Sequence, residues 1–136
     1  MKKIVLIMSM LATLANANWF NSNEKKEESM LKSTLFKDFE SKIGKEPLMI
    51  EFGSVSCYSC QVMGKILYKI KQKYPQSNIY FIDIYNDMPT AEKFGIRMIP
   101  TQKYLDENGN IIDTHMGVIE QEELVQKLKN LNIIKK

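Results

Sequence analysis

Residues 48–60 read LMIEFGSVSCYSC, an apolar run that leads within a few residues into the two cysteines of the chain. The run 48–52 carries one charged residue, Glu51, and is otherwise typical of a central strand covered on both faces. From Cys57 the apolar residues recur at helical spacing until Pro75, which predicts a helix that begins at the cysteines. The pattern therefore places both thiols where a buried strand turns into a helix.

The position of the cysteines assigns them different chemistry. Unpaired N–H groups and the dipole at a helix N-terminus favour negative charge, so we expect Cys57 to ionise below the pKa of about 8.5 of a free thiol. Cys60 lies one helical turn further along and on the same side, where it can attack a mixed disulfide formed at Cys57. The spacing predicts a redox disulfide in which Cys57 attacks and Cys60 resolves.

Three other uses of a cysteine pair compete with redox exchange. A structural staple is a poor use, because so short a loop restrains the unfolded chain by only about 2 kcal/mol. Covalent haem attachment requires His directly after the second cysteine, and residue 61 is Gln. Metal binding stays open, although methionines at helical spacing are usually core filler. Two thiolates could hold a soft ion such as Cu(I) together with Met63, Met98, Met116 or His115.

Glu51 is the one acid in its apolar strand. If its side chain points under the following helix, burial raises its pKa, and it can act as the general base for the proton that Cys60 loses. The alternative is a carboxylate in water at the edge of the strand. Strand alternation puts Glu51 on the face opposite Ile50 and Phe52, but does not tell which face is covered.

Pro100 lies where the chain re-enters a strand after Ile99. A cis bond at this point would leave the backbone of Ile99 exposed beside the thiols, where a substrate segment could pair with it as an added strand. An ordinary trans proline at the start of an edge strand is the alternative, and base rates favour it.

The remaining segments predict an α/β fold. We expect helices over 31–43 and 120–131, a short helix after residue 84 that ends at Gly95, and strands over 79–84, 103–105 and 111–115, the last two joined by Asn108-Gly109, a strong hairpin signal. The order is then helix, strand, helix, strand, helix, strand, strand, helix. It predicts a parallel unit with an appended antiparallel hairpin and helices on both faces of the sheet.

The start of the chain predicts export. Residues 1–17 combine two lysines, an apolar stretch and the ending Ala15-Asn16-Ala17, as in a secretory signal peptide. The apolar stretch, about 11 residues, is too short to span a bilayer, and no later segment predicts a span. We expect a flexible arm over 18–29 and one domain over 30–136. Removing the two leader lysines lowers the net charge from +3 to about +1, so no nucleic-acid partner is indicated.

Four features together resemble the thioredoxin family: the strand 48–52, the pair Cys57-Tyr58-Ser59-Cys60, the segment FGIRMIPT at 94–101 and the Asn108-Gly109 hairpin. The resemblance covers residues 31–131 and implies the thioredoxin fold, a central mixed sheet flanked by helices on both faces. It implies that Cys57 is the nucleophile, Cys60 the resolving cysteine and Pro100 the family's cis-proline. Glu51 falls where thioredoxins usually carry a buried Asp.

The sequence also departs from the family pattern around the cysteines. Ser56 stands where the family usually has Trp, Tyr58-Ser59 replaces Gly-Pro, and Gly64-Lys65 stands where the family has a helix-kinking proline. Met98 replaces a Gly beside the proline, so we expect a more apolar substrate groove lined by Tyr58, Met98, Ile99 and Pro100. These departures concern the partner and the redox potential, not the fold.

The predicted function is a periplasmic thiol:disulfide oxidoreductase that acts on exported proteins, as a monomer and without a separate cofactor. Electrons would pass to or from a membrane redox partner. Because no His lies between the cysteines to stabilise the thiolate strongly, we expect a reductase more than a strong oxidant. The alternative is a metal-binding module, such as a copper chaperone, that uses the same two thiols.

Overall fold

The computed structural model describes residues 29–135, and its centre is a four-stranded mixed sheet. The strands are β1 (Leu48–Gly53), β2 (Ile79–Asp83), β3 (Thr101–Leu105) and β4 (Ile111–Met116), in the spatial order β2-β1-β3-β4. β1 runs parallel to β2 and antiparallel to β3, and β3 pairs with β4 as the predicted hairpin. The predicted parallel unit with an appended antiparallel hairpin is confirmed.

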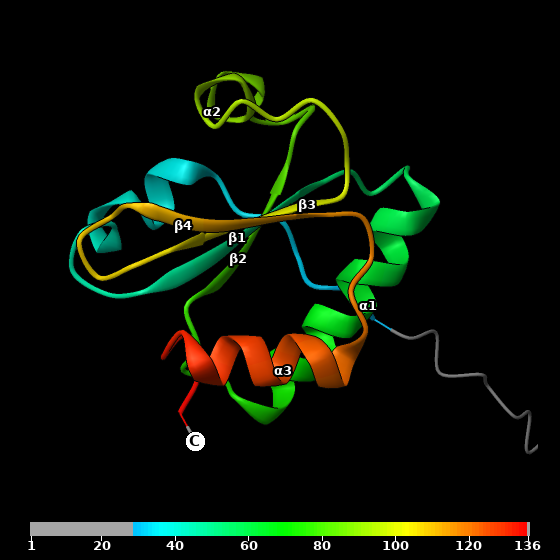
Figure 1. Cartoon of the computed structure of the whole chain (residues 1–136). Helices are drawn as coiled ribbons and strands as arrows, with labels where there is room; N and C mark the ends of the chain where they lie inside the picture. The colour runs from blue at the N-terminus through cyan, green and yellow to red at the C-terminus, as the bar shows by residue number, and fades with distance from the viewer. Residues whose placement is uncertain (1–28, 136) are drawn as a thin grey trace, which may run out of the picture.

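Helices cover both faces of this sheet (Figure 1). α1 (Tyr58–Lys73) and α3 (Gln121–Asn130) lie on one face, and α2 (Met88–Lys93) lies on the other together with two short 3-10 helices, η1 (Phe36–Asp38) and η2 (Glu40–Lys42). Met49 of β1 packs in the core under α1 and α3, whereas Ile50 and Phe52 pack in the core on the opposite face. β1 is thus buried on both faces, as its apolar sequence predicted.

The helix predicted over 31–43 is wrong. Leu31 packs in the core beneath α1 and α3, but Phe39 packs in the core on the other face of the sheet, so one helix with one apolar stripe could not serve both. The chain instead passes the edge of the sheet in extended form. Ser33 bridges Phe81 in parallel, and the N–H of Thr34 donates to the carbonyl of Phe81 at 2.7 Å. Only after this crossing does the chain turn into η1 and η2.

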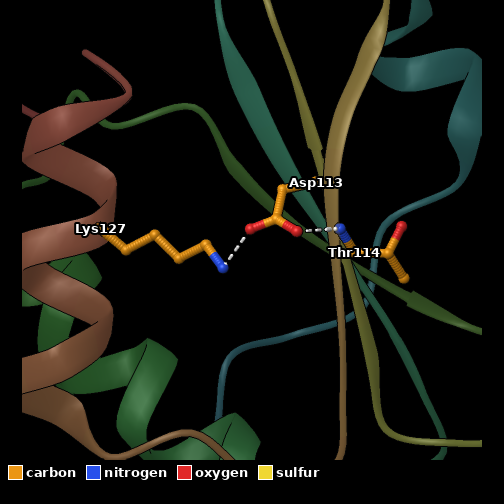
Figure 2. A network of polar contacts seen from close by, with 3 residues as sticks. All are labelled: Asp113, Thr114 and Lys127. Carbon is orange, nitrogen blue, oxygen red and sulfur yellow. Dashed lines mark hydrogen bonds and ion pairs between the residues drawn. The ribbon is translucent and has the colours of Figure 1, made fainter.

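A polar contact joins α3 to the edge strand β4 (Figure 2). The ammonium of Lys127 on α3 forms an ion pair with Asp113 on β4, and Asp113 also accepts a hydrogen bond from the backbone N–H of Thr114 at 2.7 Å. The same ammonium lies 4.4 Å from the centre of the Tyr104 ring. These contacts fix the hairpin against the helix layer that also contains α1.

The predicted signal peptide (1–17), and all but the last residue of the predicted arm (18–29), lie outside the described residues. Within residues 29–135, no helix combines the length and the apolar character that a membrane crossing requires.

The β3–β4 turn packs against the turn that follows η2. Gly109 in the hairpin and Gly44 after η2 both have positive φ, +85° and +81°. A Cβ on Gly109 would lie 3.0 Å from Cγ2 of Ile43 and 3.2 Å from the backbone nitrogen of Gly44. The hairpin turn therefore requires glycine both for its backbone conformation and for its close approach to η2.

Two alanine substitutions separate these requirements. Gly95, at φ +65°, has no atom within 4 Å of a Cβ, so Gly95→Ala should cost only the left-handed conformation, about 1 kcal/mol. Gly109→Ala adds contact with the backbone of Gly44, and we expect it to cost about 1–3 kcal/mol more. Urea unfolding followed by circular dichroism measures both values. Equal destabilisation by the two variants would contradict the close packing of the hairpin turn.

Candidate functional site

Cys57 is the N-cap residue of α1, so its sulfur lies at the first turn of the helix. Sγ of Cys57 accepts a hydrogen bond from the backbone N–H of Cys60 at 3.4 Å and lies 3.3 Å from Oγ of Ser59. The thiol of Cys60 donates to it over 2.7 Å, and both cysteines are free. Cys57 is partly exposed, whereas Cys60 is 2% exposed. The structure thus brings the two predicted thiols together, one accessible and one buried.

The surroundings drive the two pKa values apart. Burial opposes ionisation of Cys57, but hydrogen bonds from Cys60 and Ser59 outweigh it, so the pKa of Cys57 falls below its ordinary value. Burial, together with the hydrogen bond it donates to Cys57, raises the pKa of Cys60 to about 12. Of the two thiols, Cys57 therefore ionises first as the pH rises, and Cys60 keeps its proton at neutral pH.

The turn between β1 and α1 is held by polar contacts that the sequence analysis missed. Asp83, at the end of β2, accepts the backbone N–H of Val55 at 3.1 Å and that of Tyr85 at 3.0 Å. The amide of Gln61 donates to the carbonyl of Val55 at 2.7 Å. The available signal was a single acid at the end of a buried strand next to β1. These contacts fix the loop that presents Cys57.

Glu51 is 1% exposed and lies on the face of the sheet that α1 covers, so the alternative of a carboxylate in water is wrong. The side-chain nitrogen of Gln102 on β3 donates to Oε2 of Glu51 at 2.8 Å. Burial raises the pKa of Glu51 well above its ordinary value, the hydrogen bond from Gln102 partly opposes the shift, and the negative charge of Cys57 adds to it. Glu51 is therefore a buried acid whose protonation is coupled to the thiols.

Gly53 connects Glu51 to the cysteines. It lies two residues beyond Glu51, on the same face of β1. A Cβ on Gly53 would lie 3.2 Å from Cβ and 3.3 Å from Sγ of Cys60. Because Gly53 has no side chain, α1 can approach the end of the strand. Glu51 then lies two residues before the position that contacts the resolving thiol, on the same face of β1.

Pro100 and its neighbours lie at the same end of the sheet. Thr101 pairs with Phe52 at the end of β1, which brings the segment before β3 beside the turn into α1. The Ile99–Pro100 peptide bond is cis, the conformation that the resemblance implied. Pro100 is buried, and Ile99 is partly exposed. The apolar side chains of Tyr58 and Met98 are 81% and 49% exposed, so both are available to a partner.

The methionines and the histidine that the sequence offered as possible Cu(I) ligands differ in burial and position. Met63 is fully buried in the core under α1 and α3, whereas Met98 and Met116 are exposed. The ring of His115 lies on β4, with Nε2 3.4 Å from the carbonyl of Val118. Across residues 29–135, no group of three or more His, Cys, Asp or Glu side chains is arranged to hold a metal ion.

Comparison with known proteins places this geometry in a family. The family model for thioredoxin matches residues 29–130. Among solved structures, the fold is similar to mitochondrial thioredoxin 3 from Saccharomyces cerevisiae in its oxidized form, with a TM-score of 0.61 and 24% identity over 75% of this chain and 95% of that one. It is also similar to a thioredoxin from Nicotiana alata, with a TM-score of 0.63 and 20% identity over 76% of this chain and 95% of that one.

A comparison with curated proteins gave no significant match. The match to the family model covers most of the chain and includes every strand and helix from β1 to α3, with both cysteines at the turn into α1. The chain belongs to the thioredoxin family.

Proposed function

We propose that this protein is a thiol:disulfide oxidoreductase that exchanges disulfides with exported proteins, more as a reductase than as a strong oxidant. The observation that carries the proposal is the asymmetry of the thiol pair: a partly exposed Cys57 that ionises readily, 2.7 Å from a buried Cys60 with a raised pKa. Membership of the thioredoxin family supports thiol–disulfide exchange in general.

The first step uses the thiolate of Cys57. It attacks one sulfur of a substrate disulfide, which forms a bond between Cys57 and the substrate and breaks the substrate's S–S bond. The released substrate thiolate takes a proton from water. Cys60 keeps its proton during this step, since its pKa of about 12 leaves almost no thiolate at neutral pH.

The second step requires Cys60 to lose that proton. Glu51 accepts it as general base, and the thiolate of Cys60 attacks Sγ of Cys57, which breaks the bond between Cys57 and the substrate. The second substrate sulfur leaves as a thiolate and takes up a proton. Two electrons have then passed from the cysteine pair, now a disulfide, to the substrate. In the opposite direction the same steps run in reverse.

The charge on Cys57 controls when the proton passes from Cys60 to Glu51. While Cys57 is a thiolate, its negative charge raises the pKa of both Glu51 and Cys60. The mixed disulfide removes that charge, so the pKa of each group falls at the moment when Glu51 must be ionised and Cys60 must lose a proton. Attack by Cys60 is therefore favoured only after the mixed disulfide with the substrate has formed.

Substrate would bind at the end of the sheet where the accessible thiol lies. Tyr58 and Met98 supply exposed apolar surface there, and Ile99 and Pro100 form the segment beside the turn into α1. Met98 makes this surface more apolar than the glycine usual in the family. We propose that these four residues contact the substrate backbone and its apolar side chains.

The proposed cellular location depends on the predicted signal peptide. Residues 1–17 support export to a bacterial periplasm, where electrons would pass to or from a membrane redox partner and the protein would act as a monomer without a separate cofactor. The absence of His between the cysteines favours a reductase, because a strong oxidant stabilises its reduced form.

Alkylation tests the assignment of the two thiols. At pH 6–7, iodoacetamide should modify Cys57 at least on the order of 100-fold faster than Cys60, because Cys57 is partly exposed and has the lower pKa, whereas Cys60 is buried with a pKa of about 12. The rate at Cys57 should rise with pH through its lowered pKa. Peptide mass spectrometry of the reduced protein measures both sites. Equal labelling would count against Cys57 as the nucleophile.

Cysteine variants test the reaction itself. The wild type should reduce insulin disulfides, Cys57→Ser should abolish turnover, and Cys60→Ser should trap the substrate as a mixed disulfide visible on a non-reducing gel. Ser59→Ala removes one hydrogen bond to Sγ of Cys57 but keeps both thiols, so it should lower turnover by no more than about tenfold. Tight one-to-one Cu(I) binding by a reduced wild type that does not reduce insulin would favour the metal-binding alternative instead.

Redox equilibrium tests the direction. We expect a potential closer to about −270 mV than to about −120 mV, since hydrogen bonds from Cys60 and Ser59 stabilise the Cys57 thiolate and no His lies between the two cysteines to stabilise it further. Equilibration with glutathione buffers, followed by trapping of free thiols with a maleimide of known mass, gives the fraction oxidised. A potential above about −180 mV would refute the reductase assignment.

A further inference from the structure

Gln102 is a buried polar residue on β3 that the predicted chemistry did not use. It is 0% exposed and pairs directly with Glu51 across the β1–β3 ladder. Its side-chain nitrogen donates two hydrogen bonds, to Oε2 of Glu51 at 2.8 Å and to the backbone carbonyl of Gly117 at 3.1 Å. One amide thus joins the buried acid to the loop after β4.

The carbonyl of Gly117 fixes the orientation of this amide. A backbone carbonyl can only accept, so the group that faces Gly117 must be the nitrogen of Gln102. That nitrogen has two hydrogens, and both are used, one by Gly117 and one by Glu51. Oε2 of Glu51 is consequently an acceptor in either protonation state.

The two oxygens of Glu51 are therefore not equivalent. Oε1 of Glu51 is buried and has no hydrogen-bond partner within residues 29–135. A proton on Oε2 would compete with the hydrogen from Gln102, whereas a proton on Oε1 would not. The proton of the neutral acid therefore belongs on Oε1.

We propose that Gln102 is a positioning residue for the thiol exchange: it holds Oε2 of Glu51 and the carbonyl of Gly117 together, and leaves Oε1 as the oxygen that takes the proton from Cys60. The inference rests on the proposed function, in which Glu51 is the general base. Gln102 acts through Glu51 and contacts no reacting sulfur. It also favours the ionised carboxylate, since its N–H donates to an oxygen that carries negative charge only in that state.

The same amide reaches the substrate end of the sheet. The N–H of Gly117 donates to the carbonyl of Pro100 at 2.8 Å, so Gln102 links Glu51 to the segment proposed to bind substrate. The carboxyl of Glu51 is thereby linked to the Pro100 segment as well as to its own strand.

The other titratable groups around Glu51 define what its pH dependence can contain. On the strands of the face that α1 and α3 cover they are Asp83, Tyr104, Asp113 and His115, and those from the helix side that interact with Glu51 or with these strand residues are Cys57, Cys60, Glu123 and Lys127. Of these, the charge of Cys57 raises the pKa of Glu51. Burial, with the charges of Glu51, Asp113 and Glu123, raises the pKa of Tyr104. Because several of these groups titrate, the pH dependence of Glu51 has to be observed at the carboxyl carbon of Glu51 itself.

Nuclear magnetic resonance tests the contact in the wild-type protein. The side-chain ¹⁵NH₂ resonances of Gln102 should shift with pH at the same midpoint as the ¹³C resonance of the Glu51 carboxyl. Gln102→Met keeps an unbranched side chain of similar length but removes the donor, and should raise that midpoint by at least about one pH unit. Amide resonances that ignore the titration, or an unchanged midpoint in a folded Gln102→Met protein, would overturn the proposal.

Kinetics test the consequence for exchange. A chromogenic aromatic disulfide releases one thiol when Cys57 attacks and a second when Cys60 resolves, so stopped-flow absorbance separates the two steps. In Gln102→Met the second release at pH 7 should slow about tenfold and its pH profile should move upward, with the first release unchanged. Lys103→Met, the next residue on β3 with its side chain on the opposite face, should leave both steps unchanged.

A double variant shows whether Gln102 acts through Glu51. Added to Glu51→Gln, Gln102→Met should not change the pH profile of the second release any further. The same tenfold slowing in that background would mean that Gln102 acts through the Gly117 loop, and would overturn the proposal. If even the wild type fails to release the second thiol, the proposed function fails, while the NMR titration still tests the contact of Gln102 with Glu51.

Discussion

The turn from β1 into α1 is the constraint on which the rest of the site depends. A helix leaves its first N–H groups without partners, and here the group that accepts one of them is the sulfur of Cys57. A thiolate can fill this position because the helix dipole and the N–H groups favour negative charge. The cap that begins the helix is thus also the group that ionises.

The strand before this turn determines how close the two layers come. β1 is buried along its whole length, and it ends at Gly53, where a Cβ would meet both Cys60 and the ring of Phe81 at 3.2 Å. With hydrogen at this position, α1 packs directly on the end of the strand. The buried thiol of Cys60 then lies beside the strand that carries Glu51, and the raised pKa values of both groups follow from that shared burial.

A carboxyl at this depth costs stability, and the sign of the cost can be worked out. The pKa of Glu51 is raised in the folded protein, so the folded state binds its proton more tightly than the unfolded chain does. Its favourable contribution is complete below the ordinary pKa of Glu and is lost as the pH rises through the raised value. At neutral pH an apolar residue would therefore suit the fold better than Glu51. The proton transfer to and from Cys60 proposed above would explain an acid there.

Local pattern predicted most of this fold, because apolar runs, helical spacing and turn residues each mark one regular element. The strand at β1, the helix that begins at the cysteines and the Asn108-Gly109 hairpin follow from periodicity and turn residues. Residues 31–43 have helical spacing but do not form one helix, because their apolar side chains pack on both faces of the sheet. The periodicity of a sequence gives the spacing of apolar residues, but not the face of the sheet on which each side chain packs.

The polar pair of Glu51 and Gln102 shows a second limit of sequence reasoning. Each residue taken alone is one polar side chain in a strand, and either could point to water. Their pairing becomes visible only when β1 and β3 are aligned antiparallel, which puts Glu51 opposite Gln102 on the covered face. Once aligned, the two are specified together, since either one buried beside an apolar neighbour would lose its hydrogen bond. The partner of a buried acid is therefore best sought across the ladder, at the position that the strand register assigns to it.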